Sequence, residues 1–304
     1  MIIDILKLAR PRTWPFIVLS FTIGWLLTGV ALSLEFFAGL LIYIILVANV
    51  NLVNAYTDIE EDKLNLPHRV RIIERVGPKK IIFVAAALYL IATFIAIFLP
   101  FWFLIIYLIA LFDTIFYSLP PLRFKARHII GMIAFAGAVF FPALGAWTLY
   151  NDIITTPIII FFLGYWFITY GTIKNLPDYE GDKRIGLRTS ATIFDTRKKA
   201  VMFAVTLLLS PYLILLFLLL FNLIEFKFVY LFLGLPLVSF VCYKALKAKA
   251  YQTLEKMHTY GLVYAVIFLA LTLFIISLTI YSVIFLVLLL SILFLILKTR
   301  FDSR

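Results

Sequence analysis

Long stretches without lysine or arginine constrain this chain more than any other feature of its sequence. Four ranges contain neither residue: 13–62, 81–122, 128–173 and 257–297. A fifth range, 200–243, contains only Lys227. A transmembrane helix needs about 20 apolar residues, so each range has room for two helices and a tight turn. The sequence therefore predicts five helical hairpins that lie in a membrane.

Composition agrees with a membrane location and excludes several classes of protein. Of the 304 residues, 64% are hydrophobic and 14% are charged, whereas a soluble domain is about 45–50% apolar and about 25% charged. These values exclude a soluble enzyme, a disordered chain and a domain that binds nucleic acid. The single cysteine, Cys242, has no second cysteine with which to form a disulfide or a CxxC metal site.

We expect an all-α fold, a polytopic membrane helical bundle with nine core transmembrane helices plus a tenth and with two Asp-rich cytoplasmic loops. The expected helices are 14–33, 37–57, 81–99, 101–118, 129–149, 157–176, 199–221, 227–244, 259–278 and 282–297. They form one transmembrane domain, 1–304, made of two pseudo-repeats, 13–128 and 129–256, and a C-terminal hairpin, 257–298.

The net charge of +11 lies almost entirely on one side of this topology. All Lys and Arg residues except Lys227 fall at the chain ends or in the loops after the second, fourth, sixth and eighth helices. Basic residues in short loops remain in the cytoplasm, so we expect these loops to face it and the protein to lie in the plasma membrane. Lys298, Arg300 and Arg304 join them only if the tenth helix spans.

An acidic motif follows the second expected helix. Asn54, Asp58 and Asp62 are spaced by four, so on a helix they lie on one face within side-chain reach of one another. Carboxylates stacked in this way suit Mg²⁺, which takes oxygen ligands and usually binds through one or two carboxylates plus substrate phosphates. The sequence therefore predicts a magnesium site that also holds a phosphorylated substrate.

The loop after the sixth helix repeats this arrangement. Tyr170, Lys174, Asp178 and Asp182 are again spaced by four, and Asp178 follows Asp58 by 120 residues and four helices. The two acidic loops are thus expected on the same membrane face. Two acidic clusters surrounded by Lys and Arg are typical of a diphosphate site, because metal ions bridge the oxygens and cations neutralise the remaining charge.

Four motifs in order carry a family resemblance. They are the Asn54, Asp58 and Asp62 motif, the Tyr170 to Asp182 motif, the segment Ala9–Trp14 and the segment Tyr117–Lys125. Over residues 9–189 the chain resembles the intramembrane UbiA-type prenyltransferases. It departs from them at Ala55 and Asn175, where family members commonly have Asp, so metal affinity or acceptor type is expected to differ.

The resemblance implies Mg²⁺-dependent transfer of a prenyl chain from an allylic diphosphate, expected to be geranylgeranyl diphosphate, to a hydrophobic acceptor among the membrane lipids. The acceptor is either an aromatic quinone precursor or geranylgeranylglyceryl phosphate. The implied catalytic residues and metal ligands are Asp58, Asp62, Asp178 and Asp182. The implied diphosphate-binding residues are Asn54, Arg69, Lys125 and Lys174.

A third group of residues is expected to line the substrate pocket or stabilise the allylic cation. It comprises Tyr117, Tyr170 and Asp113. An aromatic face stabilises a nearby cation by about 0.5–2 kcal/mol, and an ionisable residue at membrane depth, such as Asp113, is a functional candidate. Other polar residues are interpreted more simply. Glu60, Glu61 and Glu180 are expected on a solvated face, and His128 and His258 at the membrane interface.

Two other functions compete with prenyl transfer. A transporter or ion channel is suggested by the repeated acidic sites, but transporters place such charges near the bilayer midplane on broken helices, whereas these Asp residues fall at helix ends. A CDP-alcohol phosphotransferase also uses Asp and Mg²⁺ in a membrane, but it requires an Asp-Gly-x-x-Ala-Arg run, which this sequence lacks.

The ten-helix topology predicts a cytoplasmic C-terminus. A reporter enzyme fused after Arg304 should therefore be active only on the cytoplasmic side of the membrane, because an even number of spans returns the chain to the side of its basic N-terminus. A reporter that is active outside the cell would reduce the number of spans to nine.

Overall fold

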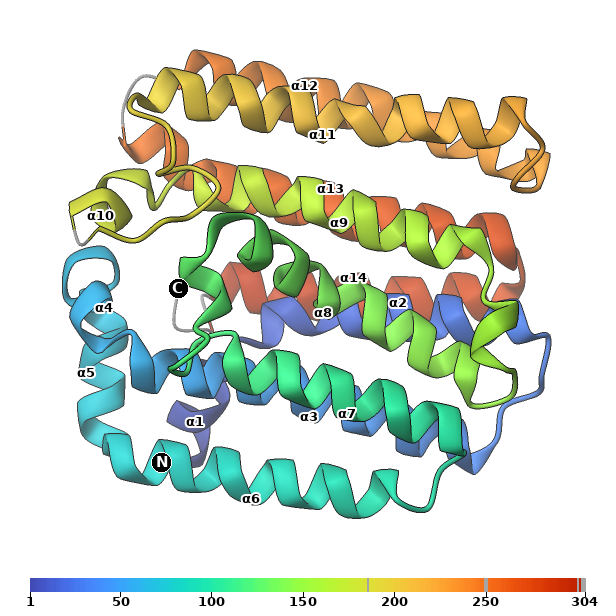
Figure 1. Cartoon of the computed structure of the whole chain (residues 1–304), viewed down its shortest axis with the longest axis horizontal. Coiled ribbons are helices and arrows are strands. Elements are labelled where there is room, and N and C mark those ends of the chain that lie inside the picture. Colours follow the sequence, from blue (N-terminus) through green and yellow to red (C-terminus); the bar gives the residue numbers. More distant parts are fainter. Residues whose placement is uncertain (185, 249–250, 300, 302–304) are drawn as a thin grey trace. The chain divides into compact units, whose positions relative to one another are not determined.

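The computed structural model describes residues 1–184, 186–248, 251–299 and 301 (Figure 1). Helices dominate these residues, and none of them lies in a β-strand. The bridge between Arg127 and Arg188 is the extended backbone pairing found in the described part of the chain. The all-α prediction is confirmed.

The chain divides into two compact units. The first comprises Met1–Arg123, Phe141–Thr156 and Thr279–Arg304, and the second comprises Phe124–Phe140 and Pro157–Leu278. Helix α8 (His128–Thr148) contributes to both units, and its internal proline, Pro142, lies directly after the point of division. The predicted pseudo-repeats stay a prediction.

The first unit is built around α3. Its helices are α1 (Ile2–Leu8), α2 (Trp14–Thr28), α3 (Leu34–Thr57), α4 (Ile59–Asn65), α5 (Pro67–Val76), α6 (Pro78–Ala96), α7 (Phe101–Phe116) and α14 (Ile280–Thr299), with a 3₁₀ turn at Pro11–Thr13. Figure 1 shows α6 running beside α3, with α4 and α5 connecting them. Gly77, at φ +90°, ends α5, and Pro78 begins α6. The acidic motif at the end of α3 therefore leads into two short helices.

The second unit is built around α9. Its helices are α9 (Ile158–Asn175), α10 (Tyr179–Arg184), α11 (Arg197–Leu220), α12 (Leu235–Lys247) and α13 (Tyr251–Ile276), with 3₁₀ segments at Phe124–Ala126 and Phe226–Gly234. Helices α11 and α13 both pack against α9. Trp166 of α9 stacks on Phe268 of α13 with ring centroids 4.4 Å apart, and its indole N–H donates to Tyr264 Oη at 2.9 Å. This contact joins the second acidic motif's helix to the core.

Eight helices in the described residues are long and apolar enough to cross a bilayer. They are Leu34–Thr57, Pro78–Ala96, His128–Thr148, Ile158–Asn175, Arg197–Leu220, Phe226–Lys247, Lys256–Ile276 and Ile280–Thr299. Helices α2 and α7 are also rich in apolar residues but have 15 and 16 residues. Helical segments thus occupy all ten predicted ranges. The number that crosses the membrane stays a prediction, and Arg300 and Arg304 lie outside the described residues.

Two predicted helices differ from the observed ones for local reasons. The helix expected over 14–33 ends at Thr28, because Gly29 takes a left-handed conformation with φ +69° and caps the helix. The helix expected over 227–244 begins as a 3₁₀ segment, Phe226–Gly234, and becomes α-helical at Leu235. Pro236 lies in the first α-helical turn, where its missing N–H costs no hydrogen bond.

A close approach between α2 and the end of α8 explains one glycine of the first unit. A Cβ atom added to Gly24 would lie 2.8 Å from Ala143 Cα and still closer to the Ala143 carbonyl group. These atoms belong to the backbone and cannot rotate away. Small residues allow transmembrane helices to pack this closely, so Gly24 sets the distance between the two helices.

Replacing Gly24 by Ala should destabilise the first unit. The added methyl group forces the helices apart, and overpacking of this kind costs about 1–3 kcal/mol of unfolding free energy. The thermal unfolding midpoint of the purified protein in detergent should fall. Val287→Ile, which adds a methylene at a residue that is 58% exposed, is the control and should leave the midpoint unchanged. Equal midpoints for both variants would contradict the close packing.

Candidate active site

The first acidic motif continues the helical path of α3 into α4. The Asp58 N–H donates to the Asn54 carbonyl at 3.0 Å, and the Asp62 N–H donates to the Asp58 carbonyl at 2.7 Å. Each residue therefore lies one turn after the preceding one, as the four-residue spacing predicts. Asp58 is the C-cap residue directly after α3, and its carboxylate accepts a hydrogen bond from Thr57 Oγ1 at 2.7 Å.

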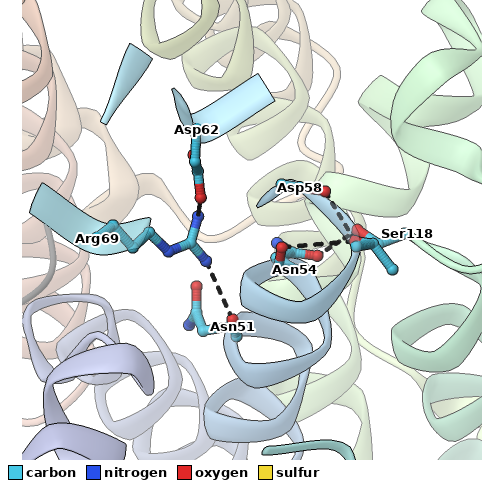
Figure 2. A network of polar contacts seen from close by, with 7 residues as sticks. Asn51, Asn54, Asp58, Asp62, Arg69 and Ser118 are labelled. Carbon is cyan, nitrogen blue, oxygen red and sulfur yellow. Dashed lines mark hydrogen bonds and ion pairs between the residues drawn. The ribbon is translucent and has the colours of Figure 1, made fainter. Parts of the chain in front are cut away.

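Asp62 forms a buried ion pair with Arg69 of α5. Arg69 Nη1 donates to Asp62 Oδ2 at 2.7 Å, and Arg69 Nη2 donates to the Asn51 carbonyl at 3.3 Å. Arg69 is 1% exposed and Asp62 is 5% exposed. Figure 2 shows the guanidinium between the carboxylate and the last turns of α3. Removing one partner of such a pair leaves a buried charge without compensation, which costs about 3–5 kcal/mol.

The segment that follows α7 is attached to the first acidic motif at two points. Ser118 Oγ donates to Asn54 Oδ1, and Arg123 forms an ion pair with Glu61 of α4. In Figure 2, Ser118 and Asn54 lie beside the Asp58 carboxylate. The segment Tyr117–Lys125 was singled out from the sequence, but Ser118 was not. The expectation for Glu61 also changes, because its carboxylate is paired rather than simply solvated.

The N-terminal motif is attached to α3 one turn before Asn54. The Asn51 side-chain amide donates to the Ala9 carbonyl at 3.3 Å, to Thr13 Oγ1 at 3.4 Å and to the Val47 carbonyl at 2.9 Å. Asn51 is buried. The segment Ala9–Trp14 thus contacts the same part of α3 that carries the Arg69 hydrogen bond.

The second acidic motif lies at the end of α9, in the second unit. Tyr170 is buried and packs against Phe167 and Phe135, with ring centroids 5.1 and 6.0 Å away. Lys174 Nζ lies 4.8 Å from the centroid of the Phe135 ring. The Asp182 N–H donates to the Asp178 carbonyl at 2.9 Å, and the Asp182 side chain is buried. A cation, an aromatic group and two carboxylates therefore lie between Tyr170 and Asp182, on α9, α10 and the turn between them.

His258 is a neighbour of this motif that sequence reasoning placed elsewhere. Its Nε2 atom lies 3.8 Å from Asp178 Oδ2, so it is near the predicted metal ligand. From the sequence, His258 was expected at the membrane interface because it lies near the start of an apolar segment. His258 follows Asp178 by 80 positions, and no local spacing connects the two residues.

Hydrogen bonds also fix α10 and the loop after it. Lys183 Nζ donates to Tyr179 Oη at 2.9 Å, and this hydrogen bond is the main reason that the pKa of Lys183 is raised. Tyr179 Oη in turn donates to the Phe194 carbonyl at 3.0 Å. Asn175, where family members commonly have Asp, donates to Ser190 Oγ at 2.9 Å. The loop is thus held against α9 and α10.

The remaining predicted residues are distributed between the two units. Tyr117 caps α7, and Asp113 is a half-buried residue one turn before it in the first unit. Lys125 lies in the 3₁₀ turn Phe124–Ala126 of the second unit. Figure 2 therefore contains only the first-unit part of the candidate site.

Each acidic motif supplies two carboxylates. Asp58 and Asp62 belong to the first unit, and Asp178 and Asp182 belong to the second. Among the described residues, no three or more His, Cys, Asp or Glu side chains gather in a group that could hold a metal ion by themselves. One or two carboxylates are what Mg²⁺ usually takes from a protein when substrate phosphates supply the other ligands. The donor set of each motif suits that mode of binding.

Comparisons with known proteins agree with these motifs. A curated relative, the digeranylgeranylglyceryl phosphate synthase of Methanosphaera stadtmanae, is 27% identical over 235 residues, which cover 76% of this chain and 82% of the relative. A solved UbiA homologue from Archaeoglobus fulgidus, bound to GPP and Mg²⁺, has a TM-score of 0.69 at 21% identity. The match covers 90% of this chain and 99% of that one.

A second solved structure, described as a digeranylgeranylglyceryl phosphate synthase in membranes, has a TM-score of 0.64 at 17% identity and covers 89% of this chain and 96% of its own. The fold is therefore shared with intramembrane UbiA structures. The model of the UbiA prenyltransferase family matches residues 14–258, which include both acidic motifs. This multi-pass integral membrane protein belongs to the UbiA prenyltransferase family.

Proposed function

We propose that this prenyltransferase transfers a geranylgeranyl chain from geranylgeranyl diphosphate to geranylgeranylglyceryl phosphate. The observation that supports this acceptor is the 27% identity, over 76% of the chain, to a relative named digeranylgeranylglyceryl phosphate synthase. An aromatic quinone precursor was the other acceptor expected from the sequence, and no relative reported above is named for one. The substrates are lipids, so the reaction takes place in the bilayer.

Mg²⁺ is the proposed cofactor, and all four Asp residues are its proposed ligands. Support comes from the carboxylate pairs at Asp58 and Asp62 and at Asp178 and Asp182, and from the Archaeoglobus fulgidus homologue, which is bound to GPP and Mg²⁺. When bound, Mg²⁺ neutralises charge on the diphosphate as the allylic carbon–oxygen bond breaks. The proposal that both pairs act on one diphosphate rests on their repeated spacing in the sequence.

The chain's own cations and amides complete the proposed diphosphate site. Lys174 and Lys125 supply positive charge to the diphosphate oxygens, and the Asn54 side chain supplies a neutral hydrogen-bonding group. The Ser118 hydroxyl donates to Asn54 Oδ1 and so fixes the orientation of the Asn54 amide. In this orientation the Asn54 amide nitrogen can donate to the diphosphate. Charge-assisted hydrogen bonds of this kind are roughly twice as strong as neutral ones.

Aromatic rings stabilise the allylic cation in this proposal. Tyr170 belongs to a group with Phe135 and Phe167, and the Lys174 ammonium lies near one of these rings. Tyr117 has a similar role in the first unit. Diphosphate departs as the allylic carbon–oxygen bond breaks, the acceptor hydroxyl oxygen then bonds to the allylic carbon, and the hydroxyl proton passes to the released diphosphate. Asp113 is proposed to line the pocket for the acceptor.

The proposed orientation places both acidic motifs on the cytoplasmic side of the plasma membrane. The loops that carry them contain 13 of the chain's 27 Lys and Arg residues, and loops rich in basic residues remain in the cytoplasm. This side also gives the site access to a water-soluble diphosphate group.

Replacing one proposed metal ligand in either acidic motif should abolish most of the prenyl transfer. Asp58→Asn and Asp178→Asn each remove a negative charge that binds Mg²⁺, and we expect kcat/KM to fall by at least about 100-fold, or about 2.7 kcal/mol of activation free energy. The measurement is formation of radiolabelled product in detergent over a range of Mg²⁺ concentrations. Asp195→Asn, which changes an exposed carboxylate paired with Lys199, is the control. Full activity in both variants would refute the metal assignment.

The acceptor is tested with a panel of compounds at fixed geranylgeranyl diphosphate. We expect kcat/KM for geranylgeranylglyceryl phosphate to exceed that for an aromatic acid by at least about 100-fold, because a site built for one polar group rejects an analogue that lacks it. Preference for the aromatic acid would overturn the proposed acceptor, geranylgeranylglyceryl phosphate. The proposed donor, geranylgeranyl diphosphate, would still stand. Absence of Mg²⁺-dependent transfer to any acceptor would overturn the proposed function.

A further inference from the structure

We propose that Arg69 is a positioning residue, which holds Asp62 in place and does not itself touch the diphosphate. The inference rests on the proposed function, in which Asp62 is a ligand of Mg²⁺. Arg69 was expected from the sequence to bind the diphosphate directly. Its burial and its hydrogen bonds point to a different role.

The guanidinium of Arg69 is enclosed by protein. The residue is 1% exposed, although arginine is almost never fully buried unless it is paired. Nη1 is directed to Asp62 Oδ2 at 2.7 Å and Nη2 to the Asn51 carbonyl at 3.3 Å. Nε is also buried and has no hydrogen-bond partner among the described residues. A diphosphate that enters from water would have to displace this packing to reach the group.

The ion pair fixes the direction of the Asp62 carboxylate. A carboxylate that is 5% exposed would be costly to keep ionised without a cation beside it. Arg69 supplies that cation and binds Oδ2, so the position of Oδ1 follows from the pair. Mutation of a group that orients a metal ligand in this way typically costs about 10–100-fold in metal affinity.

The surroundings of Arg69 fix its position. Helix α5 packs through Ile72, Ile73 and Val76 into a hydrophobic core with Leu52 and Val53 of α3. The Asn51 carbonyl belongs to the same part of α3, and Figure 2 shows the Asn51 side chain close to the guanidinium. The ion pair therefore anchors α4, which has only seven residues, to this packed core.

A matched control lies two residues away. Arg71 has the same charge and belongs to the same helix, but it is exposed and is not part of the proposed site. Lys174, the proposed diphosphate-binding cation of the second unit, is the positive control for direct binding. The three residues separate positioning from direct binding and from general electrostatic effects.

The experiment compares Arg69→Met, Arg71→Met and Lys174→Met. Two quantities are measured for each: the Mg²⁺ concentration for half-maximal activity, and KM for geranylgeranyl diphosphate at saturating Mg²⁺. For Arg69→Met we expect the Mg²⁺ requirement to rise by about 10–100-fold, with KM at saturating Mg²⁺ unchanged. For Lys174→Met we expect KM to rise at every Mg²⁺ concentration. Arg71→Met should resemble the unmodified protein.

Metal binding supplies a readout apart from turnover. Mn²⁺ binding is measured by electron paramagnetic resonance in the presence of geranylgeranyl thiodiphosphate, which reacts slowly. Arg69→Met should weaken Mn²⁺ binding, and adding Arg69→Met to Asp62→Asn should weaken it no further, because the arginine acts through the aspartate. Additive losses, or an increase in KM with an unchanged metal requirement, would overturn the positioning role.

Folding is checked by the thermal unfolding midpoint of each variant. If Arg69→Met does not fold, Arg69→Lys replaces it, since lysine keeps the charge but cannot make the same two directed contacts. The Mg²⁺ requirement of Arg69→Lys should still rise, and an increase in KM alone would again overturn the proposal. If the proposed function itself is wrong, the unmodified protein will show no Mg²⁺-dependent transfer. This outcome differs from every outcome that would overturn only the role of Arg69.

Discussion

The exclusion of water from the bilayer is the constraint on which the rest of the structure depends. Backbone groups in that environment must pair within their own segment, so the spans are helical and ionic groups move to the helix ends. Both acidic motifs begin at such ends, Asn54 in the last turn of α3 and Asp178 shortly after α9. The proposed site residues therefore lie in short segments, whose positions are fixed by tertiary contacts more than by long helices.

Those contacts differ between the two motifs. In the first unit, the buried Asp62–Arg69 pair and the Arg123–Glu61 ion pair hold the short helix α4, and Ser118 contacts Asn54 at the end of α3. In the second unit, α10 is held by Tyr179 and Lys183, which reach the backbone of the following loop. Similar spacing of aspartates in the sequence is thus supported by different neighbours in the two units.

The sequence predicted the parts of the structure that depend on local patterns. Ranges with no Lys or Arg, or with Lys227 alone, located helical segments at all ten expected places, and four-residue spacing located the turns that carry Asp58 and Asp62. Contacts between distant parts of the chain were harder to predict, because Ser118 meets Asn54, Arg123 meets Glu61 and His258 meets Asp178 only through the tertiary fold. Arg69 was predicted to bind the diphosphate, but its burial depends on the packing of α5 and could not be read from the sequence. The early end of α2 at Gly29 shows that one backbone conformation can override an apolar run.

The burial of Ala55 limits which side chains this position can accept. Ala55 is 0% exposed and belongs to the hydrophobic core formed by α3 and α5, at the position where the related enzymes commonly have aspartate. A carboxylate introduced there would be buried among aliphatic side chains without a cation prepared for it. Aspartate at position 55 would therefore destabilise this fold unless the aliphatic neighbours changed as well.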